Sequence, residues 1–364
     1  MNIAFFCIPA HGHTNPTLAV VRELTARGHT VRYYTTEAFR AKVEAAGAVF
    51  VPFDTEAARP GMTAADGARL GSDLAFSTKL IVDLTLAADD WLSRELTAHR
   101  PDVIAGDSMA FWAKLAAKKH GIPFVSSTTT FAFNRFSAKV IEQNGAGFLQ
   151  FLLAQPRINR QLKRLRAAGY AVKSVFDIIA NDNETETVVY TSPDFQPCAD
   201  TFSEKYHFVG PLLRPAQSSF EKLPGRSLIY ISLGTVNNDA LPFYRACLAA
   251  FGGDPRFQLV LSAGTQTDLA ALGPIPENCT VRASVDQMAV LDCADVFLTH
   301  CGMNSASEGL WHGLPLVLYP QTPEQHGVAN RVAALGAGVP LTDPSADGIR
   351  RAVEAALTDP AYRE

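Results

Sequence analysis

The feature that most constrains the fold of this chain is a repeated alternation of short apolar runs with longer amphipathic stretches. The alternation occurs twice, once from residue 2 and again from Leu228. Between the two series, residues 211–226 carry three prolines and few large apolar side chains, which is typical of a linker. Alternating strand and helix signals predict α/β domains with mostly parallel sheets. The boundaries that we expect are 1–213 for the N-terminal domain, 214–226 for the linker and 227–364 for the C-terminal domain.

Apolar runs and helix-stop residues place the individual elements. The turn at Pro9–Pro16 should follow the first strand, with Thr14 or Asn15 as N-cap and Pro16 near the first helical position. The expected strands are 2–8, 30–35, 48–53, 102–106, 122–126, 188–191, 207–209, 228–232, 257–262, 294–298 and 316–319. The first expected helix follows this turn and ends at Arg27. Further helices are expected at 37–46, 109–120 and 240–251, and one more after residue 304.

Length and composition exclude several classes of protein. The chain has 364 residues, of which 47% are hydrophobic and 19% are charged, enough for two domains with large cores. Its net charge of −4 predicts no nucleic-acid partner. No apolar run reaches the roughly 18 residues needed to cross a bilayer, and the apolar start lacks the basic region of a signal peptide. Six scattered cysteines without a CxxC pair favour a reduced, cytoplasmic protein.

The sequence Thr299–Gly309 reads as a tight polar turn between a strand and a helix. Asn304 and Ser305 are residue types that cap helices, and Gly302 allows the backbone to approach a ligand. The first N–H groups of a helix and its dipole attract phosphate, and His300 lies beside them as a further donor. Glu308, one turn into the helix, could accept hydrogen bonds from a sugar. A structural alternative stays open, because Ser305 and Glu308 also have the spacing of a capping box.

This phosphate site lies in the acidic half of the chain. Residues 226–364 contain 8 Arg, 9 Asp, 5 Glu and no Lys, a net charge of −6. The bulk field therefore opposes anion binding, so local N–H groups and His300 must provide the affinity. Because residues 226–364 contain no lysine, a P-loop lysine is excluded there as well.

Two histidines, His11 and His13, follow the first strand. Ligands bind at the carboxyl ends of strands in open α/β sheets, and Asp107 ends another strand. A histidine can remove a proton from a hydroxyl near neutral pH, and a carboxylate improves it by holding its tautomer. The turn is not GxGxxG, so a dinucleotide cofactor is not expected. Alternatively, His13 and Asp107 are turn or cap residues, and spacing alone does not decide between the two interpretations.

Three blocks of sequence resemble the family 1 nucleotide-sugar glycosyltransferases of GT-B fold, in particular their bacterial macrolide and natural-product branch. The blocks are Pro9–Pro16, Ser232–Thr235 and the stretch from Asp286 to Gln325. The resemblance covers nearly the whole chain. It implies two Rossmann-like domains facing each other across a cleft, the first for the acceptor and the second for the nucleotide sugar. The family normally continues beyond the position of Glu364 with a final helix that crosses back onto the first domain, so two alternatives stay open: the end is missing, or the closure between the domains differs.

The resemblance also implies residue roles. His13 matches the catalytic base and Asp107 its partner. Two departures from the family stand out: Ser284 occupies the position of an aromatic that stacks on the base, and Glu324 replaces the usual Asp. The residues that match the donor site are Gln287 (base) and Glu308 (ribose), His300, Gly302, Asn304, Ser305, Gly234 and Thr235 (diphosphate), and Glu324 and Gln325 (sugar).

The resulting expectation is an inverting, metal-independent transfer of a hexose to a hydroxyl of an apolar small molecule such as a macrolide, polyketide or flavonoid. The nucleotide sugar, UDP-glucose or a TDP-sugar, is a co-substrate, and no cofactor is expected. The aromatic-rich stretch 131–151 favours an apolar acceptor. Two alternatives remain at this point: a nucleotide-sugar epimerase of similar architecture, and a non-catalytic binding or activator protein on the same scaffold.

Overall fold

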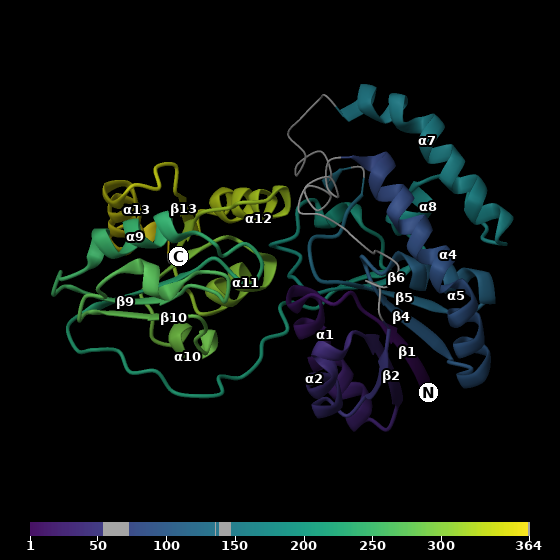
Figure 1. Ribbon diagram of the computed structural model, residues 1–364, viewed down its shortest axis with the longest axis horizontal. Coiled ribbons are helices and arrows are strands. Elements are labelled where there is room, and N and C mark those ends of the chain that lie inside the picture. Colours follow the sequence, from purple (N-terminus) through teal and green to yellow (C-terminus); the bar gives the residue numbers. More distant parts are fainter. Residues whose placement is uncertain (54–72, 135, 138–146, 363–364) are drawn as a thin grey trace. The chain divides into compact units, whose positions relative to one another are not determined.

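The computed structural model describes residues 1–53, 73–134, 136–137 and 147–362 (Figure 1). Contacts between Cα atoms divide the chain into two compact units, Met1–Leu212 and Leu213–Glu364. Each unit contains one parallel sheet flanked by helices. The six cysteines are all free thiols.

The N-terminal unit is built on a seven-stranded sheet with the order β3-β2-β1-β4-β5-β6-β7. All its neighbouring strands pair in parallel. The strand order reverses between β1 and β4, so the carboxyl ends of these two strands flank the switch point of the sheet. The strands are β1 (Asn2–Phe6), β2 (Thr30–Thr35), β3 (Val49–Pro52), β4 (Val103–Asp107), β5 (Phe124–Thr128), β6 (Glu186–Val189) and β7 (Tyr206–Phe208).

Alternate residues of β1 enter two different cores, as the period of a strand requires. Ile3 and Phe5 join a cluster with Val21 of α1 and Val43 of α2 on one face. Ala4 and Phe6 join the other face, with the buried Leu84 and Trp112 of α4 and α5. Both faces are covered, which is why the strands read as continuous apolar runs. The helices are α1 (His11–Ala26), α2 (Arg40–Ala45), α4 (Leu74–His99), α5 (Phe111–His120), α7 (Gly147–Ala167) and α8 (Phe176–Ile179).

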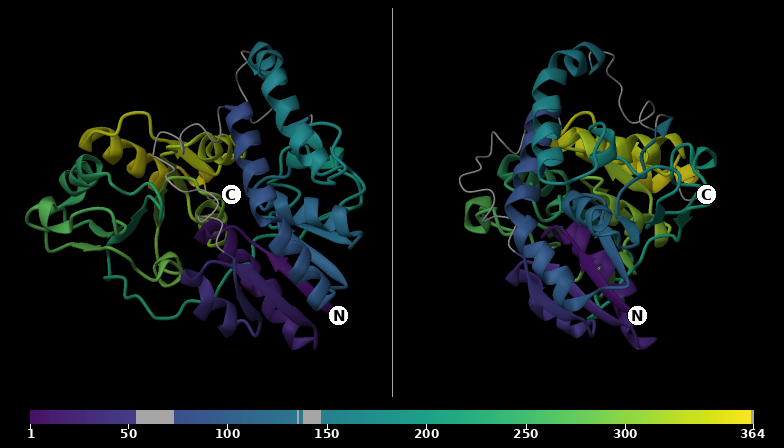
Figure 2. Two further views of the ribbon diagram at one scale, coloured as in Figure 1. Left: turned by 45° about the vertical axis from the view of Figure 1, so that its right-hand side comes forward. Right: turned by 90° about the vertical axis from the view of Figure 1, so that its right-hand side faces the viewer.

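Helix α7 packs along α4 away from the sheet (Figure 2). Ile158, Leu162 and Leu165 follow the helical period and are buried against Val82 of α4. The sequence-predicted acceptor stretch 131–151 is described only in part. Residues 135 and 138–146 lie outside the described residues, and so do the side chains of Phe148 and Phe151.

The C-terminal unit has a six-stranded parallel sheet with the order β10-β9-β8-β11-β12-β13. Its switch point lies between β8 and β11, where Thr299 pairs with Ser232. The strands are β8 (Ser227–Ser232), β9 (Phe257–Ser262), β10 (Cys279–Arg282), β11 (Val296–Thr299), β12 (Leu316–Leu318) and β13 (Gly338–Pro340). The helices are α9 (Leu241–Phe251), α10 (Gln287–Leu291), α11 (Met303–Trp311), α12 (Pro323–Ala334) and α13 (Ala346–Thr358).

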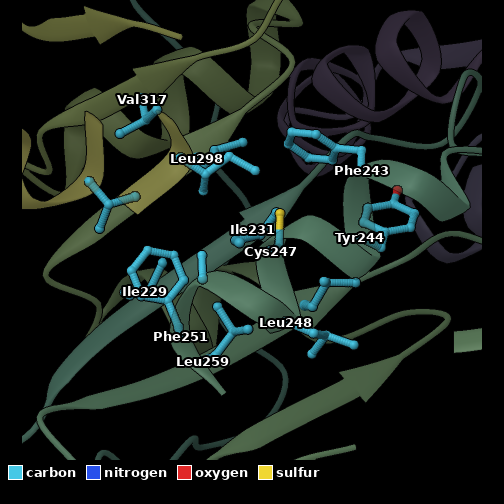
Figure 3. Close-up of a cluster of buried hydrophobic side chains, with 14 of the residues drawn as sticks. Ile229, Ile231, Phe243, Tyr244, Cys247, Leu248, Phe251, Leu259, Leu298 and Val317 are labelled. Carbon is cyan, nitrogen blue, oxygen red and sulfur yellow. The ribbon is translucent and has the colours of Figure 1, made fainter. Parts of the chain in front are cut away.

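The core of this unit lies between the sheet and helices α9 and α13. Ile231 of β8 and Leu298 of β11 pack with Cys247 and Phe251 of α9 (Figure 3). Ile349 and Val353 of α13 complete the cluster, and all six side chains are at most 1% exposed. This packing holds β8 and β11 rigidly, and with them the loops at their carboxyl ends.

Helix α1 begins earlier than the sequence suggested. The expected turn over Pro9–Pro16, with Thr14 or Asn15 as N-cap, is wrong: the helix starts at His11, Ala10 is the N-cap and Pro16 lies inside. The Ala10 carbonyl accepts from the N–H groups of His13 (3.0 Å) and Thr14 (2.8 Å), so the first turn closes before the proline is reached. His13 therefore lies on the first turn of a helix.

Candidate active site

His13 and Asp107 meet at the switch point of the N-terminal sheet. His13 Nδ1 lies 2.7 Å from Asp107 Oδ2 and 3.0 Å from the Thr129 hydroxyl oxygen. Asp107 ends β4, and Thr129 directly follows β5, the neighbouring strand. With a carboxylate as partner, Nδ1 carries the proton and donates it, so the lone pair of the imidazole is on Nε2.

The Asp107 carboxylate is fixed from two sides. Its side chain has 0% exposure, and Oδ1 accepts from the Met109 N–H at 2.9 Å. The pKa of the buried Cys7 thiol is raised well above its usual value, first by burial and then by the negative charge of Asp107. A buried carboxylate held this way can stabilise an imidazolium formed beside it.

The other first-turn histidine, His11, faces a different environment. Its ring is 5.0 Å from that of Phe39, and Lys42 Nζ lies 3.4 Å from its Nδ1. Burial, and then the Lys42 charge, lowers the pKa of His11. Since His11 has a cation for a neighbour where His13 has a carboxylate, the geometry distinguishes His13 as the candidate base.

At the switch point of the C-terminal sheet, the imidazole of His300 lies between two glycines. A Cβ atom on Gly234 would be 2.6 Å from His300 Cε1 and Nε2, and one on Gly302 would be 2.6 Å from Nε2. Gly234 also has a φ of +79°, which other residues rarely adopt. Both positions therefore require glycine for the ring to pack against bare backbone.

His300 is neutral at physiological pH. Burial lowers its pKa to about 4, against the small opposing effect of the Ser232 backbone. Its Nδ1 is buried without a hydrogen-bond partner among the residues that the structure describes. A neutral ring has one N–H to donate, so His300 can serve as a hydrogen-bond donor to an anion without carrying charge.

Helix α11 begins at Met303, and Gly302 is its N-cap. The prediction that Asn304 or Ser305 caps this helix is therefore wrong; they are its second and third residues. The chain turns early because Cys301 adopts a left-handed conformation with a φ of 63°. Gly302 has no side chain to satisfy the first N–H groups, which leaves the helix end suited to an anion.

Glu308 belongs to a hydrogen-bonded chain of side chains. Gln287 Nε2 donates to Glu308 Oε2, and the Tyr230 hydroxyl donates to Gln287 Oε1 at 3.0 Å. The capping box of Ser305 and Glu308 is thus absent, because Glu308 bonds Gln287 and Gly302 is the N-cap. Burial raises the pKa of Glu308, whereas Gln287 and then Arg214 act to lower it. The structure brings Gln287 and Glu308 together as the sequence predicted.

The loop after β8 carries Gly234 and Thr235. Buried Asn238 stabilises it by donating from Nδ2 to the Gly234 carbonyl at 3.0 Å, and Asn238 Oδ1 accepts from the Gln266 N–H. Thr235 is exposed at the tip. Gly234 thus lies against His300, whereas the diphosphate role of Thr235 stays a prediction.

The predicted sugar-reading pair lies at the start of α12. Thr322 is the N-cap, and Gln325 completes a capping box in which its Oε1 accepts from the N–H groups of Gln321 (2.8 Å) and Thr322 (3.2 Å). Gln325 therefore has a structural role that leaves its amide nitrogen as a donor. Glu324 is exposed on the first turn. Their role toward a sugar stays a prediction.

Three features of these sites were not anticipated from the sequence: the contacts of Thr129 and Tyr230, and the charge of Arg214, which acts to lower the pKa of Glu308. Thr129 could have been found by the rule that selected Asp107, since it follows the end of the adjacent parallel strand. Tyr230 lies inside β8 and reads as an ordinary core residue, so no sequence signal distinguishes it. Arg214 lies in the stretch that was interpreted as a linker.

The chain can be aligned over its whole length with known enzymes. The NDP-glycosyltransferase YjiC of Bacillus licheniformis is 33% identical over 368 residues, which cover 99% of this chain and 90% of the relative. The chain belongs to this glycosyltransferase family. Another member, the demethyllactenocin mycarosyltransferase of Streptomyces fradiae, is 33% identical over 376 residues, covering 100% of this chain and 81% of the relative.

Other comparisons agree with the assignment of this chain to a glycosyltransferase family. Residues 257–364 match the C-terminal domain family described as erythromycin biosynthesis protein CIII-like. The crystal structure of the kitacinnamycin glycotransferase superposes with a TM-score of 0.85 at 31% identity, covering 100% of this chain and 92% of that one. The predicted GT-B fold and the predicted natural-product branch of the family are thereby confirmed.

Neither alternative function, the epimerase or the non-catalytic binding protein, finds support among these relatives. Within the part of the glycosyltransferase that the structure describes, no helix combines the length and apolarity needed to cross a membrane.

Proposed function

We propose that this glycosyltransferase moves a hexose from a nucleotide sugar, UDP-glucose or else a TDP-sugar, to a hydroxyl group of an apolar natural product, with inversion at the anomeric carbon. The observation that carries the proposal is the contact of 2.7 Å between His13 Nδ1 and the buried Asp107 carboxylate. The relative from Bacillus licheniformis is named an NDP-glycosyltransferase, which supports a nucleotide sugar as donor.

The acceptor step uses His13 as general base. Nε2 removes the proton of the acceptor hydroxyl while the hydroxyl oxygen forms a bond to the anomeric carbon of the donor sugar. The bond from that carbon to the diphosphate oxygen breaks, and the nucleoside diphosphate leaves with the electron pair. One displacement on an α-linked donor gives a β-glycoside. Asp107 stabilises the positive charge that develops on the imidazole.

The donor step uses the C-terminal unit. The first N–H groups of α11, the backbone of Gly302 and the N–H of His300 stabilise the diphosphate as negative charge develops on it. These groups supply the charge stabilisation that a metal ion supplies in other transferases, which supports a metal-independent reaction. The Glu308 carboxylate accepts from ribose hydroxyls, and the Gln287 amide lies beside it for the base.

The acceptor is proposed to be apolar because of what lies at the carboxyl ends of β4 and β5. Two large apolar side chains are exposed there, Met109 at 48% and Phe133 at 49%. A cavity of ≈ 100 Å³ begins at Asp107 between them. This volume is below the roughly 150 Å³ that holds a benzene ring, so the cavity would take only one end of an acceptor. Its lining includes Asp107, Met109, Phe111, Phe131 and Phe133.

A direct test incubates the enzyme with UDP-glucose and a library of hydroxylated aromatics and macrolides, with mass spectrometry of the products. A mass gain of one hexose on an acceptor, together with acceptor-dependent release of UDP, supports the proposal. Conversion of the nucleotide sugar without any acceptor would contradict it. NMR of the anomeric proton of the product then separates inversion from retention.

A further inference from the structure

The segment 213–226, here termed the strap, is bound to the C-terminal unit beside the candidate donor site. Asp286 Oδ2 accepts from the N–H groups of Gln217 (2.6 Å) and Ser218 (2.9 Å) and from the Ser218 hydroxyl (3.1 Å). Asp286 is the N-cap of α10, yet its side chain makes no capping bond there. The carboxylate instead anchors the strap, one residue before Gln287.

The strap is held along its later part as well. Lys222 Nζ forms an ion pair of 2.5 Å with Asp295, and the Leu223 N–H donates to Gln258 Oε1 at 2.7 Å. These five interactions, made by four residues of one short segment, fix its path. The strap thus behaves as part of the C-terminal unit, although its prolines gave it the composition of a linker.

This anchoring places Arg214 at the candidate donor site. Arg214 is three residues before Gln217, so its Cα lies within about 11 Å of the Gln217 Cα. The positive charge of Arg214 acts to lower the pKa values of Asp286, Glu308 and Tyr230. Tyr230, Gln287 and Glu308 form the hydrogen-bonded chain already described. Arg214 is exposed, and the hydrogen bonds of Gln217 and Ser218 to Asp286 hold this part of the strap next to Gln287, which is proposed to hold the nucleoside.

Arg214 can supply a planar cation at this site. Residues 227–364 contain no lysine, and Ser284, on the loop before α10, is exposed and offers no ring to a base. A guanidinium is planar, stacks on rings and donates to carbonyl oxygens. It can also keep the buried Glu308 ionised, so that this carboxylate accepts from ribose.

We propose that the strap is the missing side of the nucleoside site, and that Arg214 determines affinity for the base and ribose of the donor. This inference rests on the proposed function, since it assigns the nucleoside half of the donor to Gln287 and Glu308. Asp286 acts as a positioning residue that holds Arg214 in place. The ligand class is a pyrimidine nucleoside, free or as its diphosphate.

The test compares Arg214→Ala with Arg226→Ala. Both remove one arginine from the strap, but Arg226 precedes β8 at its amino end, a strand length of about 17–20 Å from the loops at the carboxyl ends. Binding of UDP, uridine and inorganic pyrophosphate is measured by calorimetry or by ligand-observed NMR. We expect Arg214→Ala to weaken UDP and uridine by about tenfold and to leave pyrophosphate unchanged. Arg226→Ala should bind all three like the wild type.

Asp286→Ala provides a second, independent variant. It releases the strap without touching Arg214, and we expect it to weaken uridine in the same direction as Arg214→Ala. Unchanged uridine binding in both variants would overturn the proposal, and so would weakened pyrophosphate binding with normal uridine binding. Because the readout is binding and not turnover, it can fail or succeed independently of the sugar-transfer assay. Equal thermal unfolding midpoints exclude loss of the fold as the cause.

Discussion

His13 Nδ1 and Asp107 Oδ2 lie 2.7 Å apart although 94 residues separate them in the chain. The parallel pairing of β1 with β4 brings them together, because Asp107 ends β4 and His13 lies on the first turn of α1, the helix that follows β1. The carboxylate fixes the tautomer with a proton on Nδ1. In the proposed function, this arrangement makes the N-terminal unit the one that activates the acceptor hydroxyl.

Asp107→Asn should reduce kcat by about 10²–10⁴. The amide keeps the shape of the side chain, but it can donate to Nδ1 and so favours the wrong tautomer of His13. Steady-state assays with a fixed acceptor measure the effect. Binding of UDP should be unchanged, because Asp107 belongs to the other unit. An Asn variant with wild-type kcat would show that the carboxylate is not needed.

Thr129→Val should lower kcat by about tenfold. Valine keeps the volume but removes the oxygen that lies 3.0 Å from His13 Nδ1, so the imidazolium loses one acceptor. The acidic limb of the pH–rate profile should shift to lower pH, and Thr129→Ser should restore both properties. A loss of activity that serine does not restore would indicate a packing role for the Thr129 methyl group instead.

Gly234→Ala should destabilise the C-terminal unit and weaken nucleotide binding. Its Cβ would meet the His300 ring at 2.6 Å in a backbone with a φ of +79°. Gly253→Ala is the matched control, because Gly253 has a φ of +75° and nothing within 4 Å of the added Cβ. Denaturant unfolding should show about 1–3 kcal/mol more loss for Gly234→Ala than for the control. Equal losses would mean that His300 moves aside without cost.

The buried His300 should make the stability of the fold depend on pH. Burial lowers its pKa from 6.5 to about 4. Below pH 6.5 the unfolded chain therefore takes up a proton that the folded chain resists, so stability falls as the pH falls from 6.5 to 4 and this loss is complete below 4. The contribution is at most about 3 kcal/mol. Between pH 7 and pH 5, the unfolding midpoint of the wild type should fall more than that of His300→Gln. An equal fall in both proteins would contradict the assignment.

Much of the fold could be predicted from the sequence because both sheets are buried on two faces. Continuous apolar runs such as Leu228–Ser232 then identify strands directly, and the observed β8 begins one residue earlier, at Ser227. Helix starts were predicted less well. Ala10 and Gly302 cap their helices without any side-chain signal, so the sequence pointed to the polar residues that follow them.

The residues of the candidate site also differ in how well the sequence could predict them. Asp107 and Glu308 were accessible to sequence reasoning, because residue type and position at a strand or helix end suggested their chemistry. Arg214 was not, because its position depends on hydrogen bonds from the strap to Asp286 that no local pattern encodes. Likewise, the neutral state of His300 follows from burial between two glycines, which only the three-dimensional structure shows.

The role of His13 as base is tested most directly by measuring acceptor-dependent release of UDP from UDP-glucose by His13→Ala, alongside UDP binding by the same protein. The proposal predicts that release falls by about 10²–10⁴ while UDP binding stays at the wild-type level, because His13 lies on α1 of the N-terminal unit and the proposed nucleotide site lies in the C-terminal unit. Release at the wild-type rate from His13→Ala would contradict the account.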